Sequence, residues 1–167
     1  MKTFISGLVL AAVSAEAFAG DRSDSKRSAE EICTENGWQY EEHTVTTEDG
    51  YILQVWRIPG KTGEAPPSVT KPPVLLQHGI LDSANCWIMN YAEVSPAFVA
   101  AEAGYDVWLG NSRGNTYSEA NTHLDPDKDE KEFWDFSWDT MHLDITATMD
   151  YMLTQTGQDK IAYVGHS

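Results

Sequence analysis

Three residues at the end of the chain have types and spacing that suit nucleophilic chemistry. Gly165, His166 and Ser167 follow the apolar run 161–164 and match the first three positions of the pattern G-x-S-x-G. In that pattern a serine hydroxyl stands on a sharp turn between a strand and a helix, and the strained turn leaves no room for large neighbouring side chains. By themselves these three residues are weak evidence, because an ordinary strand end containing glycine explains them better.

An earlier turn could supply another part of such a site. A serine that attacks an acyl carbon needs backbone N–H donors for the oxyanion that develops there. Gly79 follows His78 and the apolar run 73–77, and its missing side chain lets the backbone fold back so that the N–H of Ile80 can face a pocket. The alternative is that His78 only caps a strand and bonds locally.

The two turns come in the order that an acyl-transfer site requires, with the serine two strand–helix units after the oxyanion turn. We therefore interpret Ser167 as a nucleophile and Ile80 as the source of one oxyanion N–H. Four further residues are expected to support the turns or contact substrate, namely His78, Gly79, Gly165 and His166.

The histidines of the chain offer no clear general base for this serine. A base must come within about 3 Å of the serine hydroxyl. His166 adjoins Ser167, but neighbours on such a turn point in different directions. Nothing in the sequence directs His43, His123 or His142 toward Ser167, and we interpret these three as structural or surface residues.

Two strand–helix units are predicted to position these turns. The segments 73–79 and 105–110 are short apolar runs ending in glycine, which is typical of buried parallel strands. Between them, Ser95 is expected to cap a helix, Pro96 to take its first position, and Gly104 to end it in the left-handed conformation.

The second unit contains a longer helix followed by the strand 160–165. Its apolar residues recur at steps of three and four and are followed by Gly157. They are Trp138, Met141, Ile145, Met149, Met152 and Leu153. The alternation of strands and helices predicts an α/β fold with a mostly parallel sheet covered by helices.

The region before these units differs in character. Residues 20–30 are mostly charged and small, which is typical of a mobile lead-in. The segment 43–59 contains two β-rich runs around Asp49-Gly50, a strong signal for a β-hairpin. The segment 60–73 is rich in Gly, Pro, Ser and Thr and is expected to be an exposed connection.

No metal site is assigned. Asp125, Asp127 and Asp129 alternate as carboxylates do in a calcium loop, but the glycine and the closing glutamate of such a loop are misplaced, so a solvated charged loop is favoured. Cys33 and Cys86 form no zinc-binding spacing, and whether they are bridged is left open.

The first nineteen residues have the form of a secretory signal. Lys2 precedes an apolar run, and Ala17 and Ala19 suit a cleavage site, so we expect residues 1–19 to be a signal peptide and 20–167 a partial domain of a secreted protein. No other stretch is apolar enough for a membrane helix. The formal net charge of -15 makes nucleic acid an improbable partner, and oligomeric state is left open.

Several blocks of the sequence, in order, resemble the acid lipase family, which includes gastric and lysosomal lipases. The resemblance spans nearly all of the chain after the expected signal peptide. The blocks are ENGWQYEEHTVTTEDGYILQVWRIP, LLQHGILDSANCW, AGYDVWLGNSRGNTYS, FWDFSWDTM and YVGHS. Together they are far more specific than the G-x-S motif alone.

The resemblance implies an α/β-hydrolase core with an N-terminal β-hairpin and a Ser, Asp, His triad. Such an enzyme hydrolyses carboxylic esters of lipids, for example triacylglycerols or sterol esters, at a lipid interface, without a metal or an organic cofactor. Ser167 matches the nucleophile and Ile80 one oxyanion donor. The second donor would be residue 168, and the triad Asp and His would follow later in the chain.

These expectations lead to specific alternatives. The parent protein is expected to be an extracellular or lysosomal lipase, while residues 1–167 alone, without the triad Asp and His, are expected to be inactive. The alternatives are another secreted serine esterase and a truncated product without catalysis. Asn111, Ser112 and Arg113 follow a strand end and could contact a ligand, but a structural role, with Arg113 fixing loop carbonyls or an acidic neighbour, is favoured.

Overall fold

The computed structural model describes residues 26–65 and 71–167. Its helices are α2 (Ala29–Glu35), the short 3-10 helix η2 (Ala84–Trp87), α3 (Pro96–Glu102), α4 (Glu130–Phe133) and α5 (Trp138–Thr156). Its strands are β1 (Glu41–Thr46), β2 (Tyr51–Ile58), β3 (Pro73–Gln77), β4 (Asp106–Gly110), β5 (Ala120–Asn121) and β6 (Ala162–Gly165). The expected signal peptide lies outside the described residues.

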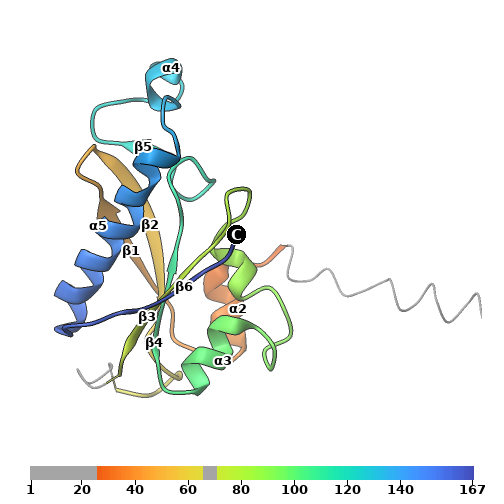
Figure 1. Ribbon diagram of the computed structural model, residues 1–167. Helices are drawn as coiled ribbons and strands as arrows, with labels where there is room; N and C mark the ends of the chain where they lie inside the picture. The colour runs from red at the N-terminus through yellow and green to blue at the C-terminus, as the bar shows by residue number, and fades with distance from the viewer. Residues whose placement is uncertain (1–25, 66–70) are drawn as a thin grey trace, which may run out of the picture.

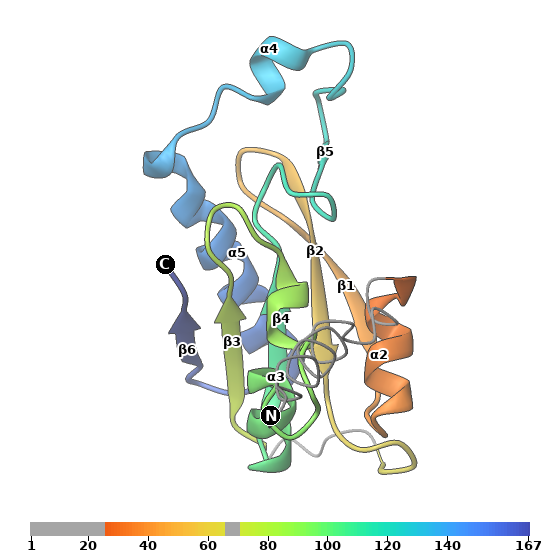
Figure 2. The ribbon, with the colours of Figure 1, turned by 90° about the vertical axis from the view of Figure 1, so that its right-hand side faces the viewer.

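The strands form one sheet in the order β1-β2-β4-β3-β6, with β5 paired to β2 (Figure 2). Strand β3 pairs in parallel with both β4 and β6, whereas β2 is antiparallel to its three partners. Strands β3 and β4 are buried along their whole length. The expected parallel core and N-terminal hairpin are therefore confirmed.

The hairpin turn follows its sequence signal. Gly50 has φ +92°, a conformation that glycine adopts at little cost. The Thr47 hydroxyl donates to Asp49 at 2.6 Å and accepts the N–H of Tyr51 at 2.9 Å, which fixes the ends of both strands.

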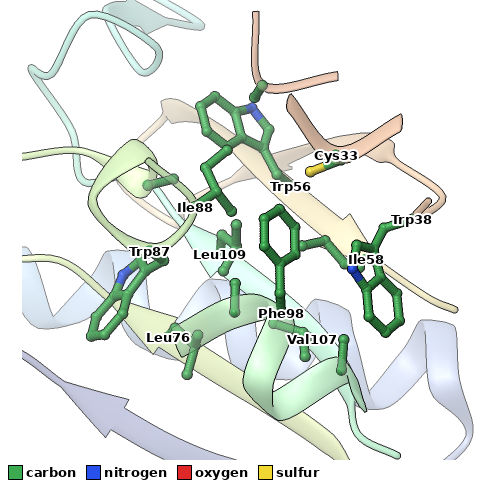
Figure 3. Packing of buried hydrophobic residues seen from close by; sticks show 14 of the residues in the cluster. Cys33, Trp38, Trp56, Ile58, Leu76, Trp87, Ile88, Phe98, Val107 and Leu109 are labelled. Atoms are coloured by element: carbon green, nitrogen blue, oxygen red, sulfur yellow. The ribbon is translucent and has the colours of Figure 1, made fainter. Parts of the chain in front are cut away.

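Helices cover both faces of the sheet (Figure 1). Helices α2 and α3 lie on one face and α5 lies on the other. A hydrophobic cluster packs between the sheet and α2, η2 and α3, and Figure 3 shows Trp56, Ile58 and Phe98 inside it. A second cluster, containing Trp108 and Phe133, lies on the side of α5. Each face of the sheet thus has its own core.

The lead-in expected over 20–30 is wrong at its C-terminal end, because α2 begins at Ala29. The Ser28 side chain accepts the N–H of Glu31, and the Glu31 carboxylate accepts the N–H of Ser28 at 2.7 Å. This capping box satisfies two backbone groups and starts a helix that buries Ile32. Residues 28–31 carry the S-x-x-E signature of a capping box, so the sequence does contain a signal for this helix.

Helix α3 matches the expectation at Pro96, its first residue, and at Gly104, whose φ is +91°. Ser95 occupies the N-cap position as expected, but its side chain does not cap the helix. The Ser95 hydroxyl makes no cap bond to α3; it donates to the carbonyl of Asn90 at 2.9 Å and accepts the N–H of Asn90 at 3.2 Å. The preceding turn competes for this side chain and binds it.

Helix α5 has the expected span and ends at Gly157, whose φ is +64°. The expected apolar face is only partly correct. Four residues at steps of four are buried, namely Asp144, Thr148, Met152 and Thr156. Trp138, the first residue of α5, is 65% exposed and does not belong to the buried face.

The acidic segment before α5 is mostly exposed, as expected for a solvated loop, but it is not structureless. It contains β5 and α4, and Phe133 at the end of α4 is fully buried.

Both Cys33 and Cys86 are free thiols, which answers the open question of their pairing. Within residues 26–65 and 71–167, no helix is long and apolar enough to cross a membrane.

Candidate active site

The carboxyl ends of three parallel strands meet at one edge of the sheet. Gln77 of β3 is in register with Gly110 of β4 on one side and with Gly165 of β6 on the other. The loops that follow these residues therefore start at the same level. In open α/β sheets, this edge is where ligands are bound.

Ser167 stands on a strained backbone. Its φ is +62°, and it is the only non-glycine residue with positive φ in the part of the chain that the structure describes. Residues other than glycine adopt this conformation only when their surroundings enforce it, and such residues gather at functional sites. The backbone N–H of His166 donates to the carbonyl of Gln77 at 3.0 Å, so the hydrogen bonding between β3 and β6 continues up to the residue before Ser167.

The turn after β3, which contains Gly79, is in contact with the turn after β6, which contains Ser167. A Cβ atom added at Gly79 would lie 3.0 Å from Cβ of Ser167 and 3.2 Å from the backbone oxygen of His166. Figure 2 shows the same proximity, with the C-terminus beyond β6 near the loop that follows β3. Any side chain at position 79 would therefore force the two turns apart by a few tenths of an ångström, whereas glycine fits without a shift.

Gly165 also meets a crowded space. A Cβ atom there would lie 3.0 Å from the ring carbon Cε1 of Tyr163 and 3.0 Å from its hydroxyl oxygen.

All six residues singled out from the sequence line one cavity of about 450 Å³: His78, Gly79, Ile80, Gly165, His166 and Ser167. The structure therefore brings together the two turns that spacing alone could only order. An apolar wall of Ile80, Trp138, Met141 and Ile145 lies beside them.

His142 lines the same cavity, which its sequence position did not reveal. Its ring is exposed, and Nδ1 lies 2.8 Å from the carbonyl oxygen of Asp139 in its own helix. The other two histidines interpreted as structural or surface residues, His43 and His123, do not line this cavity. His43 instead lies between the hydroxyl of Tyr151 and the carboxylate of Glu41, each 3.1 Å from a ring nitrogen.

His78 is buried at the start of the turn that follows β3. Its Nδ1 lies 2.7 Å from the carbonyl oxygen of Gly79, while Nε2 faces the N–H of Ser112 at 3.1 Å and the side-chain amide of Asn115 at 3.2 Å. Burial lowers the pKa of His78. The local bond considered in the sequence analysis exists, and it is made to the peptide group that carries the Ile80 N–H.

Two asparagines of the loop after β4, Asn111 and Asn115, hold the surroundings of His78 in place, although their sequence positions did not predict this. Asn111 is 2% exposed and ties the loop to β2 and η2, because its side chain donates to the carbonyl of Gln54 and accepts the N–H of Ala84, both at 3.0 Å. Asn115 lies between Asn111 and His78. The frequency of asparagine in this loop was the only available signal.

Arg113 has the structural role that was favoured for it. Its side chain is fully buried and binds two carboxylates, Asp49 at the hairpin turn and Asp144 of α5. Hydrogen bonds from Arg113 and Thr47 lower the pKa of Asp49, although burial acts in the opposite direction. The guanidinium also lies 4.1 Å from the ring centroid of Tyr51. Arg113 thus joins three separate elements.

No cluster of three or more potential metal ligands occurs in segments 26–65 and 71–167. The alternating carboxylates of the acidic loop instead bind their own backbone and a lysine. The Asp125 side chain accepts the N–H of Asp127 and the ammonium of Lys128.

Comparison with known families gives two matches that together cover most of the chain. A model described as a partial alpha/beta-hydrolase lipase region matches residues 29–91, and a model described as the alpha/beta hydrolase fold matches residues 72–167. The second match includes the whole of the cavity lining.

Curated relatives are similar over most of this chain. Gastric triacylglycerol lipase of Mus musculus is 48% identical over 86% of the chain and 36% of that protein. The same lipase of Homo sapiens is 51% identical over 78% and 33%, and lipase lipl-1 of Caenorhabditis elegans is 44% identical over 96% and 40%. The chain thus spans between a third and two fifths of the length of these relatives.

Solved structures share the fold at much lower identity. An esterase from Pyrococcus furiosus has a TM-score of 0.53 and 18% identity, with 79% of this chain and 41% of that chain covered. A protein of unknown function from Agrobacterium tumefaciens has a TM-score of 0.52 and 14% identity, with 75% and 49% covered. These similarities concern the fold alone.

Proposed function

Because the chain belongs to the acid lipase family of α/β hydrolases, we propose that it contributes the nucleophile and one oxyanion donor of a serine lipase. The observation that carries the proposal is the strained backbone of Ser167, in contact with the Gly79 turn. A serine on such a turn presents its hydroxyl at the end of the sheet, beside backbone donors.

In the proposed mechanism, a histidine base takes the proton of Ser167 Oγ as this oxygen forms a bond to the ester carbonyl carbon. The N–H of Ile80 and a second N–H stabilise the oxyanion. Collapse breaks the bond to the alcohol, which leaves with the proton, and water then hydrolyses the acyl-enzyme to the free acid. We propose that the base and its Asp partner follow Ser167 in the chain of the complete enzyme, in the order Ser, Asp, His that the family resemblance implies.

The proposed substrates are carboxylic esters of lipids, such as the triacylglycerols named for the gastric relatives. The apolar wall beside Ser167 supports this choice, because Ile80, Trp138 and Met141 can accept an acyl chain. Residues 1–19 are proposed to direct the protein into the secretory pathway, with 20–167 belonging to the hydrolase domain that then acts outside the cell or in lysosomes.

Labelling with a fluorophosphonate probe tests the nucleophile. In the enzyme expressed from its complete coding sequence, we expect the probe to modify Ser167, because only an activated serine reacts readily. Peptide mapping by mass spectrometry locates the adduct. Heat-denatured enzyme should remain unlabelled. An adduct at another serine, with Ser167 unmodified in active enzyme, would contradict the assignment.

The substrate class is tested separately with a series of ester chain lengths. A lipase should hydrolyse long-chain esters and become more active above the concentration at which they form an interface. Hydrolysis restricted to short, dissolved esters would identify instead an esterase with the same nucleophile.

Gly79→Ala should lower kcat about tenfold, because the new Cβ meets the backbone of His166 and the Cβ of Ser167, so that one of the two turns must shift by a few tenths of an ångström. This loss is smaller than the roughly hundredfold loss that a displacement of about 1 Å at a reacting group can cause. Steady-state kinetics on the complete enzyme measure it.

Gly60→Ala is the matched control. Its new Cβ meets the ends of the flexible Glu64 and Lys71 side chains, which can move away, so kcat should be unchanged. Equal activity in the two variants would show that the close contact between the turns is unimportant.

A further inference from the structure

The protonation of His78 is determined by its partners. The carbonyl oxygen of Gly79 can only accept, so Nδ1 of His78 must carry a proton. The N–H of Ser112 can only donate, so Nε2 must be an acceptor. His78 is therefore neutral, with its proton on Nδ1, and its burial, which lowers the pKa, favours the same state.

The side-chain amide of Asn115 has an equally defined orientation. The N–H of Tyr117 donates to Oδ1 of Asn115 at 3.0 Å, so Nδ2 points the other way. Its two hydrogens face Nε2 of His78 at 3.2 Å and Oδ1 of Asn111 at 2.9 Å. Since Asn111 is itself fixed by backbone bonds, Asn115 presents a donor, and not an acceptor, to His78.

The Nδ1–H of His78 acts on the peptide group that matters for the proposed mechanism. The carbonyl of Gly79 and the N–H of Ile80 belong to one planar peptide unit and point in opposite directions. A donor that holds the carbonyl at 2.7 Å therefore also fixes the direction of the N–H of Ile80.

We infer that Asn115 is a positioning residue of the ester-hydrolysing site: with the Ser112 amide, it holds His78 in the Nδ1–H tautomer, and His78 orients the Ile80 amide toward the oxyanion. The inference rests on the proposed role of Ile80. It connects the loop after β4 to the stabilisation of the transition state. Asn115 itself does not line the cavity that contains Ser167.

A double-mutant cycle in the complete enzyme tests this path. His78→Gln keeps an acceptor near the Nε2 position but has no donor for the carbonyl of Gly79, so kcat should fall about tenfold to a hundredfold with KM unchanged. Asn115→Ala should lower kcat about threefold to tenfold because, of its three side-chain hydrogen bonds, only the one to His78 acts on the proposed oxyanion donor. In the His78→Gln background, Asn115→Ala should have no further effect.

Two further variants separate positioning from general structure. Asn85→Ala removes one side-chain bond, to the hydroxyl of Tyr117, in the cavity that Asn115 also lines, and should leave kcat unchanged. His78→Asn places a donor near the Nδ1 position and should restore kcat about fivefold relative to His78→Gln. Equal losses in the Asn and Gln variants, or additive effects in the cycle, would overturn the inference.

Nuclear magnetic resonance of enzyme labelled with ¹⁵N in its histidines reads the tautomer directly. His78, identified by the signal missing from His78→Gln, should show the pattern of a proton on Nδ1. An Nε2–H pattern would refute the inference regardless of kinetics. If His78 shows the Nδ1–H tautomer while Ser167→Ala retains activity, the proposed function fails and the hydrogen-bond path remains as structure only.

Discussion

Ser167→Ala should lower kcat for lipid-ester hydrolysis by about a millionfold in the complete enzyme, the loss typical of removing the nucleophile from a serine hydrolase. The variant keeps the fold and the oxyanion donors but has no oxygen that can form the acyl-enzyme. Residual hydrolysis should proceed without a covalent intermediate, so no burst of product should precede the steady state. Quenched-flow assays with a long-chain ester measure both kcat and the initial burst of product.

Ser83→Ala provides a matched control. Ser83 lines a neighbouring cavity that includes Ile80, and its side chain makes no cap bond to η2. The same chemical change at this position should leave kcat unaltered. Hydrolysis by Ser167→Ala at the rate of the Ser83→Ala variant would mean that the nucleophile lies elsewhere.

The strands and helices nearest the site could be predicted from the sequence because their signals are local. Strands β3 and β4 are short apolar runs, buried on both faces, that end near glycine. Gly104 and Gly157 mark the ends of α3 and α5 through the conformation they adopt. Failures arose where tertiary contacts decide, as when the hydroxyl of Ser95 binds the preceding turn instead of capping α3.

The site could be predicted only in part. Residues 77–80 and 165–167 lie close together because two parallel strands in register end at the same edge of the sheet, where the loops that follow them begin. Asn115 could not be placed by this reasoning, since its contact with His78 joins residues 37 positions apart through loop geometry that no periodicity records. Trp138 was identified as part of a helix, but that it lines the same cavity as Ser167 depends on how α5 packs against the sheet, which periodicity does not record.

Arg113→Met should lower the free energy of unfolding by about 3–5 kcal/mol, because it leaves the buried carboxylate of Asp144 without its cationic partner. Asp144 is 3% exposed and accepts both the Nε–H and the backbone N–H of Arg113 at 2.8 Å, and only the backbone bond survives the change. Urea denaturation of the complete enzyme, followed by tryptophan fluorescence, measures the loss.

Lys61→Met is the control, since the Lys61–Glu102 pair is exposed and such pairs contribute little to stability. Its denaturation midpoint should not change measurably. If Arg113→Met and Lys61→Met behaved alike, the buried network would not be a source of stability.

The Arg113 network should also affect activity through geometry. Helix α5, which Arg113 fastens to the hairpin turn through Asp49 and Asp144, leads directly into β6 and hence to Ser167. A loosened helix should let Ser167 shift relative to Gly79, so kcat of Arg113→Met should fall even under conditions where the variant is fully folded. Wild-type kcat in folded Arg113→Met would show that β3 and the backbone bond between His166 and Gln77 position the serine without help from α5.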